Sequence, residues 1–326
     1  MNIKKNYMAI VIIVICSISL VICTDSKIND TKKEVGIIQI IEHDCLDQAR
    51  NGFIDGLSEL GYKDGENINI DYKNAQGDQS VCNSIANSFT NNTRKKDLIL
   101  AISTPSAQAV AKLTKEIPIL ITAVTDPVSC GLIKTKDRPG TNITGSSDMV
   151  SVENQIKLIK KLVPKTKKIG VLYCSNEANS KLQAEMANKE AKKLNMETKN
   201  YTVSNSSELL QIMEHIGKYV DAIFVPTDNL IVSCMPLVSK IALENGIPII
   251  CSESASVKNG ALATYGIDFY ELGKITAKQA AKILNGESTP EHMPIEYLNE
   301  PKLVLNSKTA EKLGISIPND LKGGTI

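Results

Sequence analysis

Short apolar runs that each end in a group of polar residues are the feature that most constrains the fold of this chain. Five runs have the length and the β-branched content of buried strands. They span residues 35–40, 98–102, 118–124, 169–174 and 222–226. Segments with helical spacing separate them, as in 46–60, which Gly61 is expected to end. Alternating strands and helices predict an α/β fold with parallel sheets and right-handed crossovers.

The second half of the chain repeats the pattern of the first. Three pairs of segments match at offsets between 124 and 134 residues: 34–37 with 168–171, 97–99 with 221–223, and 117–119 with 247–249. A length of 326 residues suits two domains with separate cores. We therefore predict two Rossmann-like, doubly wound lobes. The turn-rich segment 139–146 lies between the halves, and we expect it to form a crossing strand between the lobes.

The N-terminus has the pattern of an export signal. Lys4 and Lys5 precede an apolar run over 8–22 that is short for a membrane span and typical of a signal-peptide core. The run ends in a lipobox-like LVIC, which predicts lipidation at Cys23 and a tether over 24–33, although Ile22 departs from the small residue usual there. The alternative is an uncleaved anchor. Both place the remainder outside the cytoplasmic membrane.

Composition and cysteine spacing exclude several classes of function. The net charge is +1, no long basic run occurs and Trp is absent, which argues against a nucleic-acid partner. Six cysteines follow the leader: Cys45, Cys82, Cys130, Cys174, Cys234 and Cys251. Their spacing predicts no metal site. An even number in an exported chain permits disulfides, but Cys174 and Cys251 end apolar runs, which favours buried thiols.

The polar residues after the strands predict a binding site, because parallel sheets bind ligands beyond the carboxyl ends of their strands. The candidates are Glu42, His43, Thr104, Ser106, Thr125, Asp126, Glu177, Asn179, Ser180, Asp228, Asn229, Asp268 and Tyr270. They include carboxylates and hydroxyls but no Lys or Arg, so the site should favour a ligand with a positive group. Asp228 and Asp268 are the first choices to bind an α-ammonium group. Helix capping or turn formation is the alternative for each.

Helix N-termini and rings supply the other groups that an amino acid needs. Thr104 and Ser106 open one expected helix, with Thr104 as N-cap, and Asn179 and Ser180 open another, with Ser180 as N-cap. Their hydroxyls and nearby backbone N–H groups suit a ligand carboxylate, and plain capping is the alternative. Flat walls for an aromatic side chain could come from Tyr173, Phe269, Tyr270 or His43. We expect 269 and 270 to lie on opposite faces of a strand, so that one of them lines the site.

Catalysis finds no support in the sequence. Neither GxSxG nor GxxxxGK[ST] occurs, and the first strand lacks GxGxxG. The chain has only three His residues and no evident pairing of a base with a nucleophile. We expect no enzyme activity and no cofactor, with a secreted α/β enzyme as the less favoured alternative.

Several motifs together resemble one family. They are EHDCLDQARNGFIDGLSELGY, NAQGD, TPSAQA, VTDPVSCGL, PGTNITG, GVLYCSNEANS, VPTDNLI and GALATYGIDFYELGK. Over about 35–318 the chain resembles substrate-binding proteins of ABC importers, in the subfamily associated with aromatic amino acids. The resemblance implies type I periplasmic-binding architecture, in which two lobes close on a ligand. His43-Asp44 departs from the family's His-Pro after the first strand.

The resemblance leads to a specific functional hypothesis. We expect a monomeric, membrane-anchored lipoprotein that binds a free amino acid (Trp, Tyr or Phe) and delivers it to an ABC permease. Another small amino acid or a cationic metabolite is the alternative ligand, and an added role in adhesion stays open. We expect one lobe over 34–145 plus about 268–290, and the other over 146–267 plus about 291–326.

Overall fold

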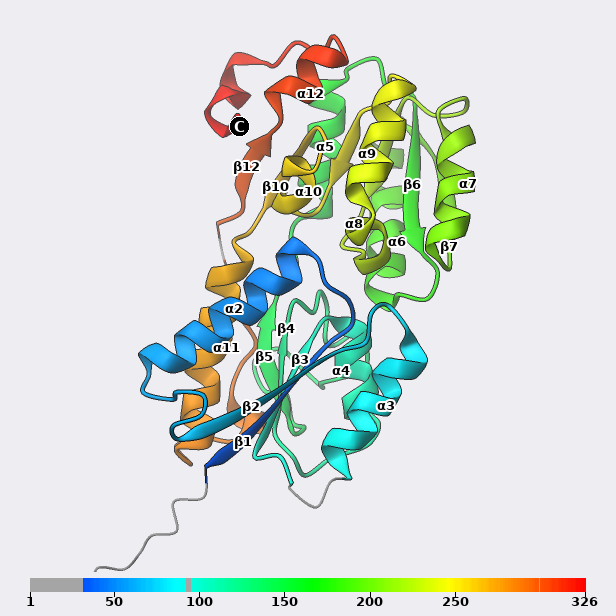
Figure 1. Ribbon diagram of the computed structural model, residues 1–326. Coiled ribbons are helices and arrows are strands. Elements are labelled where there is room, and N and C mark those ends of the chain that lie inside the picture. Colours follow the sequence, from blue (N-terminus) through cyan, green and yellow to red (C-terminus); the bar gives the residue numbers. More distant parts are fainter. Residues whose placement is uncertain (1–31, 92–94, 299) are drawn as a thin grey trace, which may run out of the picture. The chain divides into compact units, whose positions relative to one another are not determined.

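The computed structural model describes residues 32–91, 95–298 and 300–326 (Figure 1). The predicted signal peptide, the lipidation site at Cys23 and nearly all of the tether lie outside these residues. Within the described part of the chain, no helix has the length and apolar character needed to cross a membrane.

The first lobe is built on a parallel sheet of six strands in the order β2-β1-β3-β4-β5-β11. The strands are β1 (Lys33–Gln39), β2 (Ile68–Asn74), β3 (Leu98–Ile102), β4 (Ile119–Thr122), β5 (Ile143–Ser147) and β11 (Glu296–Tyr297). Strands β3, β4 and β5 are buried throughout. This burial on both faces explains their continuous apolar or small-residue sequences.

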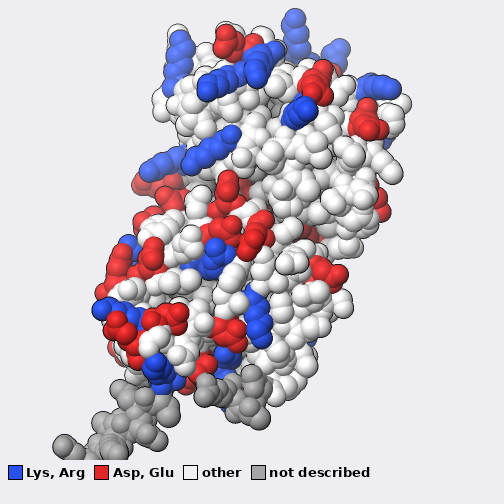
Figure 2. Space-filling model, viewed as in Figure 1, with Lys and Arg blue, Asp and Glu red and all other residues white. Residues whose placement is uncertain are grey.

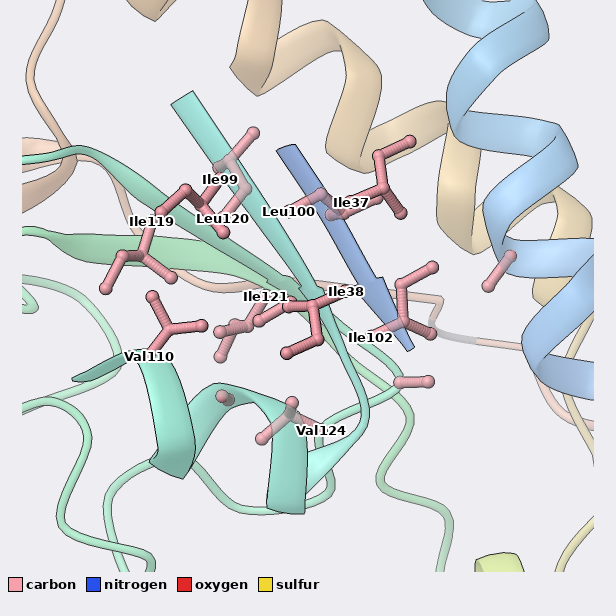
Figure 3. Packing of buried hydrophobic residues seen from close by; sticks show 14 of the residues in the cluster. Ile37, Ile38, Ile99, Leu100, Ile102, Val110, Ile119, Leu120, Ile121 and Val124 are labelled. Atoms are coloured by element: carbon pink, nitrogen blue, oxygen red, sulfur yellow. The ribbon is translucent and has the colours of Figure 1, made fainter. Parts of the chain in front are cut away.

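Helices cover both faces of the first sheet. α2 (Asp44–Glu59) and α11 (Phe269–Leu284) pack together on one face, while α4 (Thr104–Ala111) lies on the other (Figure 3). α3 (Gln79–Thr90) lies next to α4 (Figure 1). The face of α2 predicted from its spacing is buried, with Ala49, Phe53 and Leu57 fully enclosed. Gly61 follows the end of α2 with a φ of +91°, as expected of a glycine that stops a helix.

The second lobe has a sheet in the order β7-β6-β8-β9-β10-β12, parallel except for the antiparallel edge strand β12. Its strands are β6 (Lys168–Cys174), β7 (Glu197–Val203), β8 (Ala222–Val225), β9 (Ile249–Cys251), β10 (Ala263–Gly266) and β12 (Lys302–Leu305). Its helices are α5 (Val152–Leu162), α6 (Ala178–Lys193), α7 (Ser206–Ile216), α8 (Asn229–Ser233), α9 (Met235–Glu244), α10 (Ser254–Lys258) and α12 (Ser307–Lys312). Two short 3-10 helices complete the described elements, at Pro290–His292 and Asn319–Gly324.

The two lobes repeat one topology, which confirms the predicted pair of doubly wound units. The order β2-β1-β3-β4-β5 corresponds strand by strand to β7-β6-β8-β9-β10. A hydrogen bond from the first strand of each lobe to an aspartate also recurs. Asp97 accepts a bond of 2.8 Å from the Glu34 N–H, and Asp221 accepts one of 2.8 Å from the Lys168 N–H. These are the residues at which the sequence repeat was detected.

The lobe boundaries differ from those expected at two places. Ser146 and Ser147 continue β5, so 139–146 does not cross between the lobes, and the chain leaves the first lobe after Ser147. Residues 296–297 pair with β5 and therefore belong to the first lobe. Gly145 is the physical reason for the first difference. Its φ of +141° lets the backbone of β5 approach β4 closely, since an added Cβ would lie 2.0 Å from the Ile121 carbonyl oxygen.

Surface charge differs between the lobes. On the face seen in Figure 2, most charged residues of the second lobe (upper part of the view) are Lys or Arg, whereas Asp and Glu gather on the first lobe among fewer Lys and Arg. The concentration of carboxyl groups described below is a property of the buried interior.

Candidate functional site

Polar residues from both lobes meet at the carboxyl ends of the two sheets. We define the interlobe cluster as His43, Cys45, Thr104, Thr125, Asp148, Glu177, Asn179, Asp228, Asn229 and Glu253. Contacts cross between the lobes within it: His43 Nε2 lies 3.5 Å from Asn229 Oδ1, and α4 packs against α6. The cluster is enclosed, with Asp148 and Glu253 each only 3% exposed.

Glu177 joins two loops of the second lobe. It is the N-cap residue of α6, and its carboxylate accepts bonds from the backbone N–H groups of Asn229 (3.1 Å) and Leu230 (3.2 Å) and from the Asn229 side chain. Burial, together with the nearby carboxylate of Asp228, raises the pKa of Glu177 to about 8. This side chain therefore holds the second-lobe half of the cluster in place.

Both carboxylate oxygens of Asp228 are used by the backbone. One accepts a bond of 2.6 Å from the Cys174 N–H, and the other accepts one of 2.9 Å from the Ile231 N–H as the N-cap of α8. Burial raises the pKa of Asp228, while these backbone donors act in the opposite direction. Asp228 lies in the cluster as expected, but the structure gives it the capping role that the sequence left as the alternative.

Seven buried polar atoms of the cluster have no hydrogen-bond partner in the described structure. They are His43 Nδ1, Thr104 Oγ1, Thr125 Oγ1, both carboxylate oxygens of Asp148, Asn179 Oδ1 and Glu253 Oε2. An unsatisfied buried polar atom costs about 1–3 kcal/mol. Their gathering at one place, contributed by both lobes, is typical of a site whose atoms bind another molecule.

Asp148 and Glu253 are the two acids of the cluster with free carboxylate oxygens. Burial raises the pKa of Asp148 to about 6; the neighbouring Thr125 hydroxyl opposes this shift, although the two groups are not aligned for a regular hydrogen bond. Burial, and then the charge of Asp148, raises the pKa of Glu253 well above its usual range. A positive group between these acids would favour the ionised form of both.

A cavity of about 300 Å³ adjoins the cluster and is lined by both lobes. The first lobe contributes Ile40, Ile41, Pro105 and residues 77–80, and the second contributes Cys174, Asn176, Glu177, Ser204, Asn229 and Leu230. Because Glu177 and Asn229 belong to both the cluster and this lining, the cavity leads to the cluster from one side.

Backbone strain gathers at the same edge of the first sheet. Gln76, Ser103 and Ala123 have φ values of +54°, +83° and +54°, and they follow the ends of β2, β3 and β4. Left-handed conformations are unfavourable for such residues and tend to occur at binding sites.

The structure brings seven of the predicted site residues together: His43, Thr104, Thr125, Glu177, Asn179, Asp228 and Asn229. Five lie elsewhere. Glu42 is exposed and accepts a bond from Tyr72; Ser106 contacts Ser103 and Cys82 inside the first lobe; Asp126 binds the backbone N–H groups of its own turn. Asp268 is exposed and caps α11, and Tyr270 donates to Asp55 on the outer face. Ser180 is buried, and its hydroxyl donates to the Thr227 carbonyl oxygen.

Several residues therefore have positions or helix-capping roles that differ from those expected. Asp268 is outside the cluster because its carboxylate accepts bonds from the first backbone N–H groups of α11. The N-caps of α4 and α6 are Ser103 and Glu177, since Thr104 and Ser180 already lie inside these helices. Phe269 is buried in the first-lobe core.

Residues 269 and 270 were expected to lie on opposite faces of a strand, and this expectation is also wrong. They open helix α11 and lie in no strand, so strand alternation does not apply to them. Tyr173 is packed in the core of the second lobe. Of the rings considered, His43 alone belongs to the interlobe cluster.

Asp148, Glu253 and Cys45 were missed. Asp148 directly follows the last residue of β5, and Glu253 lies two residues after β9. The sequence repeat could have found Glu253, because 247–249 matched 117–119, whose strand end was already among the candidates. Cys45 was not among the site candidates, because nothing in its spacing shows that Glu253 approaches it.

Comparison with known proteins gives consistent results. Residues 34–323 match the family model described as ABC transporter substrate binding protein. A tyrosine-binding protein from Clostridioides difficile is 49% identical over 290 residues, which are 89% of this chain and 82% of that protein. A domain from Streptococcus pneumonia, solved in complex with L-Trp, superposes with a TM-score of 0.87 at 36% identity, covering 91% of this chain and 100% of that one.

A second solved relative shows which arrangement of lobes this structure has. The ligand-free, open structure of a substrate-binding protein with adhesive properties from Clostridium difficile is 46% identical and covers 90% of this chain and 99% of that one, yet its TM-score is 0.67. The less identical L-Trp complex fits better. The lobes here are therefore arranged more like those of the ligand-bound relative. The expected type I periplasmic-binding architecture is confirmed.

Proposed function

The chain belongs to the family of ABC transporter substrate-binding proteins, and we propose that it binds a free aromatic amino acid between its lobes and delivers it to an ABC permease. The family implies an extracytoplasmic location and a binding role without chemistry on the ligand. The observation that carries the proposal is the set of buried, unpartnered polar atoms that both lobes contribute to the interlobe cluster.

The free carboxylates suit the α-ammonium group of the ligand. Asp148 and Glu253 interact electrostatically and have oxygens without partners, whereas Asp228 uses both oxygens on backbone N–H groups. An ammonium group placed between Asp148 and Glu253 would form charge-assisted hydrogen bonds and relieve their mutual repulsion. We therefore assign this pair the role that the sequence had suggested for Asp228 and Asp268.

Hydroxyl groups of the first lobe suit the ligand carboxylate. Thr104 Oγ1 and Thr125 Oγ1 are buried without partners, and Thr104 opens helix α4, whose first backbone N–H groups carry partial positive charge. A ligand held by these groups and by Glu253 would touch both lobes, so binding and closure would be coupled.

The aromatic character of the ligand is supported by the relatives. One is named for tyrosine binding and another was solved with L-Trp.

The proposal also includes anchoring to the membrane through a lipid on Cys23, and a monomeric state. Exchange of Cys23 for Ala should release the protein from the membrane fraction, and retention there would contradict the lipid anchor.

Calorimetric titration of the chain with the twenty amino acids tests the function. We expect binding of Tyr, Trp or Phe, and Asp148→Asn should weaken it at least about tenfold, because a charged hydrogen bond contributes roughly 1.5–3 kcal/mol. Asp268→Asn is the matched control and should retain the native affinity, since Asp268 only caps α11. Heat with none of the three aromatic amino acids would overturn the aromatic assignment, and equal loss in both variants would overturn the assigned ammonium site.

A further inference from the structure

Three side chains of the interlobe cluster place metal-binding atoms close together. One nitrogen of the His43 ring, the Cys45 sulfur and one carboxylate oxygen of Glu253 all lie within 4.8 Å of one another. His43 and Cys45 come from the start of α2 in the first lobe, and Glu253 is the N-cap residue of α10 in the second. The spacing of the cysteines predicted no metal site. It could not reveal this set of residues, because His43 and Cys45 meet Glu253 only where the two lobes approach each other.

The electron pairs needed for coordination are available. His43 Nδ1 and Glu253 Oε2 are buried and have no hydrogen-bond partner, while the other ring nitrogen of His43 lies 3.5 Å from Asn229 Oδ1. When Nε2 carries the proton and donates to Asn229, the lone pair of the buried Nδ1 stays free for coordination. Histidine ligands are typically held in this way by a second hydrogen bond.

We propose that His43, Cys45 and Glu253 bind a divalent transition metal of the zinc type across the two lobes. One nitrogen, one sulfur and one oxygen match the ligands of zinc sites that keep a fourth position open. Magnesium and calcium prefer all-oxygen sites, so the thiol selects against them. Coordination at about 2.0–2.3 Å needs donors somewhat closer than 4.8 Å, which small side-chain rotations supply.

The ion changes the chemistry of the buried thiol. Cys45 is a buried thiol, and a thiol coordinates a metal as the thiolate. Binding replaces the thiol proton with a sulfur–metal bond and releases the proton to solvent. Because ligands come from both lobes, the bound ion also holds the lobes together.

Zinc titration of the full chain, stripped with EDTA and kept reduced, tests the site. We expect one zinc ion per chain, release of a proton on binding, and a thiolate-to-cobalt absorption band when Co²⁺ replaces zinc. Cys45→Ser and Glu253→Gln should each weaken zinc binding about tenfold or more. Cys130→Ser is the matched control, because Cys130 is a partly exposed thiol outside the cluster and should leave zinc affinity unchanged.

Each result has a definite meaning. Absence of zinc binding to the folded chain, or unchanged affinity in both Cys45→Ser and Glu253→Gln, overturns the metal site. Loss of affinity in Cys130→Ser also overturns it, since adventitious binding to exposed thiols would then explain the signal. Because Glu253 also belongs to the proposed ammonium site, amino-acid binding to the native chain is measured separately in EDTA. The two proposals are then distinguishable, since either binding can fail while the other holds. Circular dichroism confirms that each variant is folded.

Discussion

Buried carboxyl groups dominate the chemistry between the lobes at the scale of single residues. Asp148, Glu177, Asp228 and Glu253 all have raised pKa values, and burial is the largest cause for each. Buried acids are normally paired with cations or donors. Glu177 and Asp228 meet this need with backbone N–H groups, whereas Asp148 and Glu253 keep free oxygens. This difference separates the acids that build the site from those that are free to bind.

The raised pKa of Glu177 predicts how stability varies with pH. Its value of about 8 in the folded protein exceeds the ordinary 4.5, so between these pH values the folded state keeps a proton that the unfolded state has released. Stability therefore falls as pH rises through this window. We expect Glu177→Gln to reduce the fall in unfolding free energy between pH 5 and pH 8 by on the order of 1–3 kcal/mol.

Urea denaturation at pH 5, 6.5 and 8 measures this effect. Glu153→Gln is the control, because Glu153 is an exposed acid on α5 that pairs with Lys157 and should leave the pH profile close to that of the native chain. Identical pH profiles for the native chain and Glu177→Gln would show that Glu177 is already ionised in the folded protein.

The sequence predicted where the site lies better than which atoms are free. Residues at strand ends such as Thr104 and Glu177 fall in the cluster because the carboxyl ends of parallel strands share one edge. Sequence position does not show what each side chain bonds to. Asp228 and Asp268 look alike in sequence, yet one is buried on two backbone donors and the other is an exposed cap.

At the scale of elements, the packing of α2 against α11 fixes where His43 and Cys45 lie. Two glycines allow these helices to touch. A Cβ on Gly52 would lie 2.0 Å from the Tyr270 carbonyl oxygen, and one on Gly273 would lie 2.1 Å from the Ala49 carbonyl oxygen. Both contacts are with backbone, which cannot move aside without shifting a helix.

Gly273→Ala should therefore destabilise the protein by about 1–3 kcal/mol, despite the better helix propensity of Ala. Chemical denaturation gives the change in unfolding free energy. The matched control is Gly323→Ala, because nothing lies within 4 Å of an added Cβ there, and we expect a change of no more than about 0.5 kcal/mol. A Gly273→Ala variant as stable as the native chain would mean that α2 and α11 can separate freely.

Element types were predictable because hydrophobic period and turn residues act locally. The run 46–60 became α2, and the repeated strands 98–102 and 222–226 became β3 and β8. The segment 139–146 was expected to cross between the lobes, but its second half lies in β5 for a non-local reason. Its strand character depends on hydrogen bonds to β4, and β4 can approach only because Gly145 has no side chain.

At the scale of the whole Lys33–Ile326 unit, unpartnered polar atoms destabilise the closed arrangement of the lobes, and a bound ligand can remove this destabilisation. Seven buried polar atoms of the cluster have no partner when the lobes are together. A buried polar atom that stays without any partner costs about 1–3 kcal/mol, so groups that bond to these atoms favour the closed arrangement. A ligand that bonds to these atoms removes this cost and adds contacts with both lobes, so it shifts the population toward closure.

Small-angle X-ray scattering with and without a saturating aromatic amino acid should detect this shift. We expect the radius of gyration of the chain to fall on addition of the amino acid that gives heat in calorimetry, and to stay constant with one that gives none. In Asp148→Asn the same fall should need at least about tenfold more ligand, since the variant loses a charged hydrogen bond that is formed on binding. If scattering stays unchanged while calorimetry shows binding, the lobes are already closed in the free protein, and the unpartnered atoms of the cluster must then be satisfied by water.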